Sequence, residues 1–134
     1  MIGVLLVTHG EIGTAMLASA SQILGGAPQQ AATLSVWRQD DPDDLVLRAR
    51  ELLEQLDAGD GVLVLTDIFG ATPGNVVSRL LDDNQVEGVS GVSLPMLLRV
   101  LTSRNGSLAA AVKRALSGGA EGVVHMNSDR CLDA

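Results

Sequence analysis

Two residues with catalytic side chains, His9 and Asp67, each follow an apolar run of the sequence. The first run covers residues 2–8 and the second covers residues 62–66. Continuous apolar runs of this length are typical of strands that are buried on both faces of a parallel α/β sheet. Open α/β sheets bind ligands at the carboxyl ends of their strands. We therefore expect His9 and Asp67 at the ligand-binding edge of such a sheet.

A histidine beside a carboxylate is suited to nucleophilic catalysis. A carboxylate that accepts a hydrogen bond from one imidazole nitrogen fixes the tautomer and leaves the other nitrogen free to attack. It also stabilises the positive ring that forms when the free nitrogen attacks phosphorus or carbon. If the two strands are neighbours, we predict His9 as the nucleophile and Asp67 as the group that orients it. The competing interpretations are a structural histidine and an aspartate that caps a turn or helix.

A loop of small residues follows Asp67 and is a candidate phosphate-binding segment. Gly70, Ala71 and Thr72 precede Pro73, a residue that is favoured in the first turn of a helix, and Thr72 is predicted as the helix cap. Helix N-termini offer unpaired backbone N–H groups, which small residues leave accessible to an anion. We expect Gly70, Ala71 and Thr72 to bind a phosphoryl group on His9. The chain has no nucleotide-binding Gly-Lys-Ser/Thr or GxGxxG motif, so no nucleotide cofactor is expected.

The other reactive residues are expected to be structural. The acidic run at 40–44 resembles a metal site, but an aspartate before a proline, with further acids behind it, predicts the start of a helix. We therefore predict no metal centre. His125 and the single cysteine, Cys131, are assigned no role, while Trp37 is a candidate for either the site edge or the core. One cysteine allows no internal disulfide, which suits a reducing cytoplasm.

The composition describes one folded domain that spans residues 1–134. Hydrophobic residues make up 46% of the chain and charged residues 19%, as in globular proteins. The formal net charge of −7 disfavours nucleic acid and anionic membranes as partners. No apolar stretch approaches the ~20 residues of a membrane span. The expectation is a cytoplasmic protein that needs no cofactor.

Predicted strands alternate with predicted helices along the chain. This alternation indicates a three-layer α/β/α domain with a mostly parallel sheet and right-handed crossovers. Gly118-Gly119 is predicted to end the last helix. The predicted strands are 2–8, 31–37, 62–66, 86–93 and 122–126, and the predicted helices are 11–24, 42–57, 73–83, 94–103 and 107–117.

Three motifs together resemble the mannose-type (mannose/fructose/sorbose) enzyme IIA component of the bacterial phosphoenolpyruvate-dependent sugar phosphotransferase system. They are Thr-His-Gly at 8–10, Thr-Asp-Ile-Phe-Gly-Ala-Thr-Pro at 66–73 and Gly-Val-Ser-Leu-Pro-Met-Leu at 91–97. Their order and spacing match that family over essentially the whole chain. The resemblance implies a phosphoryl-carrier protein that works without a nucleotide, in sugar uptake or its regulation.

The resemblance also implies specific partners and site residues. His9 would accept a phosphoryl group on Nε2 from the phosphocarrier protein HPr and pass it to a IIB component. Asp67 would hold Nδ1, and Gly70, Ala71 and Thr72 would receive the phosphate. The family further implies a homodimer whose sheet has one antiparallel edge strand exchanged between subunits, here assigned to Gly122–Met126.

Three other functions stay open at the level of sequence. The chain could be the related IIA-like phosphocarrier subunit of a dihydroxyacetone kinase. It could be a regulatory binding module that does not pass on a phosphoryl group. It could also be a small-molecule enzyme in which His9 and Asp67 act as an acid–base pair, for which a deep apolar pocket beside His9 is the discriminating feature.

Overall fold

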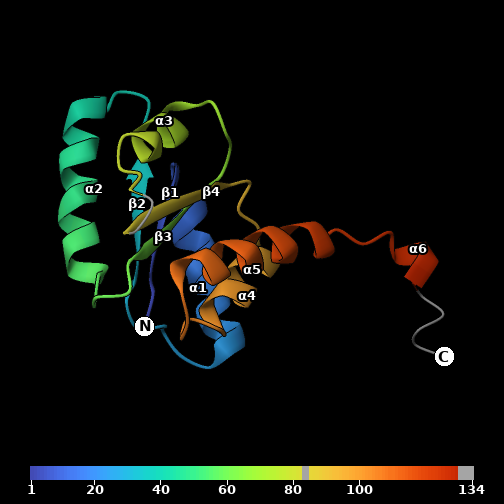
Figure 1. Cartoon of the computed structure of the whole chain (residues 1–134). Helices are drawn as coiled ribbons and strands as arrows, with labels where there is room; N and C mark the ends of the chain where they lie inside the picture. Colours follow the sequence, from blue (N-terminus) through green and yellow to red (C-terminus); the bar gives the residue numbers. More distant parts are fainter. Residues whose placement is uncertain (83–84, 130–134) are drawn as a thin grey trace.

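One parallel sheet organises the part of the chain that the computed structural model describes, residues 1–82 and 85–129. The strand order in this sheet is β2-β1-β3-β4, so β1 and β3 occupy its centre (Figure 1). All three pairings are parallel, as predicted. The strands are β1 (Gly3–His9), β2 (Ala31–Val36), β3 (Val62–Thr66) and β4 (Val86–Ser90).

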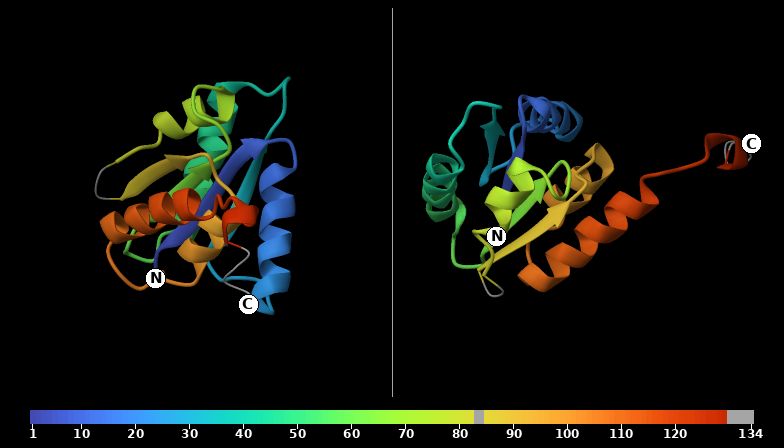
Figure 2. Two further views of the ribbon diagram at one scale, coloured as in Figure 1. Left: turned by 90° about the vertical axis from the view of Figure 1, so that its right-hand side faces the viewer. Right: turned by 90° about the horizontal axis from the view of Figure 1, so that it is seen from above.

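Helices cover both faces of the sheet (Figures 1 and 2). On one face, α2 and α3 pack against Leu5 and Val7 of the central strand. On the other face, α1, α4 and α5 enclose Val4 and Leu6. This alternation of buried side chains along β1 explains its continuous apolar sequence. The helices are α1 (Ile12–Leu24), α2 (Pro42–Leu56), α3 (Thr72–Ser78), α4 (Leu94–Leu101), α5 (Leu108–Glu121) and α6 (Met126–Asp129).

The strand predicted at 122–126 does not form within the single chain, and the described residues contain no antiparallel edge strand. Residues 122–125 have no regular structure, and Met126 begins the short helix α6. After α5 the chain extends away from the body of the protein (Figure 2). Val123 is 85% exposed and Met126 is 79% exposed, because no strand or helix of the described residues covers this segment.

Helix α5 also differs from its prediction, because it continues through Gly118-Gly119 to Glu121. A β-carbon at Gly118 would lie 3.1 Å from Cβ of Arg99, and one at Gly119 would lie 2.8 Å from Cε of Met96. These glycines therefore permit the close approach of α4 and α5 and do not end the helix.

Helix α3 is shorter than predicted and ends at Ser78. Its N-terminal flanking residue is Ala71, and no side chain caps it, so the prediction of Thr72 as the cap is wrong. Thr72 is instead the first residue of the helix, and its side chain is available for contacts outside α3. Among the described residues, no helix is both long enough and apolar enough to cross a membrane.

A prediction follows from the crossing of β1 and α2 at Gly3. A β-carbon on Gly3 would lie 2.5 Å from the backbone oxygen of Leu56, and a backbone atom has little freedom to move aside. We expect Gly3→Ala to lower the free energy of unfolding by about 1–3 kcal/mol, the usual cost of overpacking. Gly26→Ala is the matched control, because nothing lies within 4 Å of a β-carbon there. Equal urea midpoints for the two variants would contradict this packing argument.

Candidate functional site

The pairing of β1 with β3 brings His9 and Asp67 together. These strands run parallel with Val7 opposite Thr66, so both strands reach the same edge of the sheet within two residues. His9 is the last residue of β1, and Asp67 directly follows β3. The predicted contact between His9 and Asp67 requires these strands to be neighbours, and they are.

The Asp67 carboxylate lies in direct contact with the His9 ring. Its Oδ2 atom is 2.8 Å from Nδ1 of His9 and also accepts a 3.1 Å hydrogen bond from the His9 backbone N–H. The other oxygen, Oδ1, accepts a 3.1 Å hydrogen bond from the backbone N–H of Ile68. An ionised carboxylate only accepts hydrogen bonds, so it favours the tautomer with the proton on Nδ1 and the lone pair on Nε2.

Burial and hydrogen bonding act in opposite directions on the pKa of Asp67. The side chain is only 12% exposed, and this desolvation raises its pKa. Hydrogen bonds from the His9 ring and from the backbone N–H groups of His9 and Asp67 itself lower it, as does the charge of a protonated His9. The net result is a pKa below the ordinary value of 3.8. Asp67 is therefore ionised at neutral pH, while the His9 side chain is 48% exposed and accessible from outside.

His9 lines an open hollow of about 480 Å³ at the edge of the sheet. Thr72 from the start of α3 lines the same hollow, and so do Trp37 and Arg38 from the segment after β2. The Trp37 ring lies close to Gly10, where an added β-carbon would be 3.3 Å from it. Trp37 thus belongs to the site edge, one of the two places that its sequence position suggested.

The predicted loop residues do not all line this hollow. Gly70 and Ala71 lie in the loop before α3, and Thr72 is the one of the three that lines the hollow beside His9. Gly70 has a φ of 87°, a conformation that glycine adopts without strain. The preceding Ile68 and Phe69 are exposed, and Phe69 lines a separate, smaller hollow together with residues of α3 and β4.

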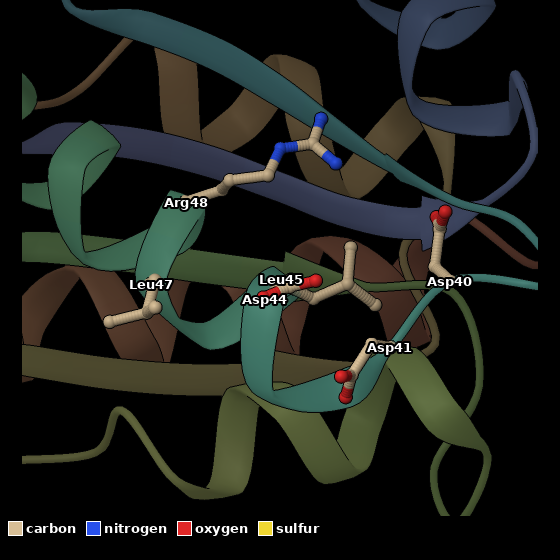
Figure 3. Close-up of a pocket in the computed structure, with 6 residues that line it drawn as sticks. All are labelled: Asp40, Asp41, Asp44, Leu45, Leu47 and Arg48. Carbon is tan, nitrogen blue, oxygen red and sulfur yellow. The ribbon is translucent and has the colours of Figure 1, made fainter.

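The acidic run at 40–44 forms the start of α2, as predicted. Oδ1 of Asp41 accepts a 3.0 Å hydrogen bond from the backbone N–H of Asp43 and caps the helix. Three of these acids border a second hollow of about 380 Å³ (Figure 3). Asp40 lines both hollows, so the two are adjacent. The lining residues of the second hollow are Asp40, Asp41, Asp44, Leu45, Leu47 and Arg48.

The remaining reactive residues lie away from His9 or outside the described residues. His125 follows α5, where its Nδ1 is 2.7 Å from Oγ of Ser128. Cys131 lies outside the described residues. Within residues 1–82 and 85–129, no three histidine, cysteine, aspartate or glutamate side chains gather as a metal site would require.

The structure adds Arg38 to the residues beside His9. Arg38 was not predicted, because one arginine after a short strand carries no pattern of its own. The signal that could have found it is topological: residues 31–37 were predicted as a strand, and the residue after a strand of a parallel sheet lies at the ligand-binding edge.

The fold and the site together define an α/β protein with a histidine–carboxylate pair at the carboxyl edge of its parallel sheet. Comparison with known proteins identifies the family. The family model described as "PTS system fructose IIA component" (EIIA-man) matches residues 3–116. The chain therefore belongs to the mannose-type EIIA family of the sugar phosphotransferase system, and the resemblance inferred from the three motifs is confirmed.

Individual relatives agree with this assignment. The chain is 30% identical to the mannose-specific EIIAB component of Escherichia coli K12 over 125 residues, which are 91% of this chain and 38% of that relative. It is also 30% identical to the fructose-specific EIIA component of Bacillus subtilis 168 over 105 residues, which are 78% of this chain and 71% of that relative. The chain thus spans less than half of the first relative.

A solved structure shows the same fold. The crystal structure of the phosphotransferase system component EIIA from Streptococcus agalactiae superimposes with a TM-score of 0.84 at 25% sequence identity. The match covers 96% of this chain and 99% of that one.

The lowered pKa of Asp67 predicts a specific pH dependence of stability. An aspartate with a folded-state pKa below 3.8 stabilises the fold above that pH, and the contribution is lost as the pH falls through the folded-state pKa. We expect Asp67→Asn to have a lower free energy of unfolding than the wild type at neutral pH. The difference between the two should become smaller below pH 3.8. Urea unfolding at several pH values measures this. Glu54→Gln, an exposed position on α2, is the control, and a gap that stays constant with pH would refute the prediction.

Proposed function

We propose that the chain is a phosphoryl carrier in which Nε2 of His9 accepts a phosphoryl group and passes it on. The observation that carries this proposal is the 2.8 Å contact between Nδ1 of His9 and Oδ2 of Asp67. This contact keeps the proton on Nδ1, so the Nε2 lone pair is the free nucleophile. The half-exposed ring suits a group that must meet two protein partners in turn.

The transfer step needs no metal or nucleotide within this domain. The Nε2 lone pair attacks phosphorus and forms an N–P bond, while the bond between phosphorus and the donor nitrogen breaks and leaves its electron pair on the donor. No proton leaves Nδ1, so the phosphorylated His9 ring carries a positive charge that the Asp67 carboxylate stabilises. Transfer onward is the same step in reverse, with a new acceptor. Catalysis then consists of positioning and charge stabilisation.

The loop before α3 is proposed to receive the phosphoryl group. Thr72 supports this role because it lines the same hollow as His9 and offers a hydroxyl donor. Gly70 and Ala71 precede it, and nothing lies within 4 Å of the position that a side chain on Gly70 would take. An anion is free to approach the backbone there.

The donor is proposed to be phospho-HPr and the acceptor a IIB component, in sugar uptake or its regulation. Membership of the EIIA family supports both assignments. A relative from E. coli is named as a combined EIIAB component, which suits transfer from an A part to a B part. We place residues 1–134 as one EIIA domain that acts in the cytoplasm.

The decisive variants are His9→Ala and Asp67→Ala. Incubation with phosphoenolpyruvate, enzyme I and HPr is expected to add one acid-labile phosphoryl group to the wild type, as intact-mass analysis would show. His9→Ala removes the acceptor nitrogen and should abolish this gain. Asp67→Ala should leave the fold intact but slow phosphorylation by at least about tenfold, since it removes the group that fixes the tautomer.

The control for these variants is His125→Ala, which changes the other histidine of the chain. It should be phosphorylated at the wild-type rate. Phosphorylation of His9→Ala at that rate, or no gain of mass by the wild type while HPr itself is phosphorylated, would end the carrier proposal.

We also propose a homodimer in which residues 122–126 add an antiparallel strand to the partner's sheet. Two observations support it. This segment leaves the body of its own chain with its apolar side chains exposed (Figure 2). In addition, β4 is an edge strand: Val86 pairs with Asp82 through its N–H and C=O, and beyond Val86 no strand of the described residues covers the outer edge of β4.

Val123→Asp tests the dimer. A charge at this apolar position should prevent the segment from packing against a partner, so analytical ultracentrifugation should find a dimer for the wild type and a monomer for the variant. Leu116→Asp, an exposed change on α5, should leave the dimer intact. The exchange would be rejected if the wild type were a monomer, or if Val123→Asp formed dimers with the same affinity as the wild type.

A further inference from the structure

Arg38 is held beside His9 by a closed turn. β2 runs parallel to β1 with Val36 opposite His9, and the backbone N–H of Gly10 donates a 2.9 Å hydrogen bond to the Val36 oxygen. The chain then turns: the Asp40 N–H donates to the Trp37 oxygen at 3.0 Å, and the Trp37 N–H donates to Oδ2 of Asp40 at 2.8 Å. Arg38 lies inside this turn, so its backbone is fixed next to the end of β1.

The guanidinium of Arg38 has no protein partner in the described part of the chain. Its side chain is exposed and lines the same hollow as His9 and Thr72. By contrast, Arg79 and Arg99 form ion pairs with Asp43 and Glu121. Arg38 therefore places a positive charge at the edge of the hollow that no described residue neutralises. Its guanidinium has five N–H donors in a planar arrangement.

The site needs such a charge when His9 is phosphorylated. The phosphoryl group brings negative charge into a hollow that Asp40 also lines, next to the ionised Asp67 and on a chain with a net charge of −7. Asp40 is held by the Trp37 N–H, so it stays at the hollow. Arginine binds phosphoryl oxygens through two parallel hydrogen bonds and keeps its charge at any physiological pH.

We infer that Arg38 binds the phosphoryl oxygens while the group moves to and from Nε2 of His9. This inference rests on the proposed carrier function and adds a residue to it. The guanidinium donates hydrogen bonds to the oxygens that carry the developing charge, and no bond to Arg38 itself forms or breaks. Electrostatic stabilisation of this kind is effective in phosphoryl transfer because the reaction requires little other chemistry from the protein.

The test compares two phosphoryl donors, one a protein and one a small molecule. Phospho-HPr must dock on the surface around His9, whereas phosphoramidate presents only the phosphoryl group. We expect Arg38→Gln to slow phosphorylation of His9 by both donors, on the order of 10- to 100-fold. Arg38→Lys should recover part of the rate, because it restores the charge but not the paired hydrogen bonds.

The matched control is Arg48→Gln, which removes the same charge from the neighbouring hollow on α2 (Figure 3). It should keep the wild-type rate with both donors. Because Arg38 and Arg48 are both exposed, both variants should also unfold at the wild-type urea midpoint.

The outcomes separate this inference from the carrier proposal. If Arg38→Gln slows transfer from phospho-HPr alone, Arg38 is a docking contact and the inference is wrong. If Arg38→Gln and Arg48→Gln are phosphorylated at equal rates by both donors, the inference is wrong as well. Phosphorylation of the wild type would then still uphold the carrier function. A wild type that neither donor phosphorylates would overturn the carrier function and, with it, the role of Arg38.

Discussion

The site depends on one contact, the hydrogen bond between the His9 ring and the Asp67 carboxylate. Oδ2 of Asp67 accepts hydrogen bonds from Nδ1 and from the backbone N–H of His9, while Oδ1 accepts one from the N–H of Ile68. The carboxylate is thus fixed from two strand ends at once, and it fixes the ring in turn. The contact exists only in the present register of β1 and β3, because a slip of one residue would turn one of the two side chains to the opposite face.

Burial on both faces of the sheet holds that register. Residues 3–8 of β1 are all buried, between α2 and α3 on one side and α1, α4 and α5 on the other. The last buried position, Thr8, is polar, and its Oγ1 accepts a 2.8 Å hydrogen bond from the N–H of Gly13. This bond joins the end of β1 to the start of α1. The chain can therefore change direction immediately after His9 without leaving a buried polar group unsatisfied.

Local signals predicted the elements that a single segment can specify. Apolar runs identified β1 and β3, and Asp41 before Pro42 located the start of α2, which the observed cap confirms. Features that depend on a second segment were predicted wrongly or missed. Gly118-Gly119 has the composition of a helix end but serves the contact of α5 with α4, and residues 122–126 have a strand-like composition but no strand beside them in one chain. Arg38 shows the same limitation, since its nearness to His9 arises only when β2 pairs with β1.

Exposure of the charged groups fits the reversibility that a carrier requires. Coulomb attraction between a guanidinium and a phosphoryl group is strong in a dry interior and far weaker near water. A buried arginine would hold the phosphoryl group too firmly for a second protein to remove it. Arg38 is exposed at the rim of the hollow, and the His9 ring is half-exposed, while Asp67 is mostly buried behind the ring. Asp67, which we propose to orient the ring, is thus inside the protein. His9 and Arg38, which we propose to contact the transferred phosphoryl group, lie where a donor and an acceptor can both reach them.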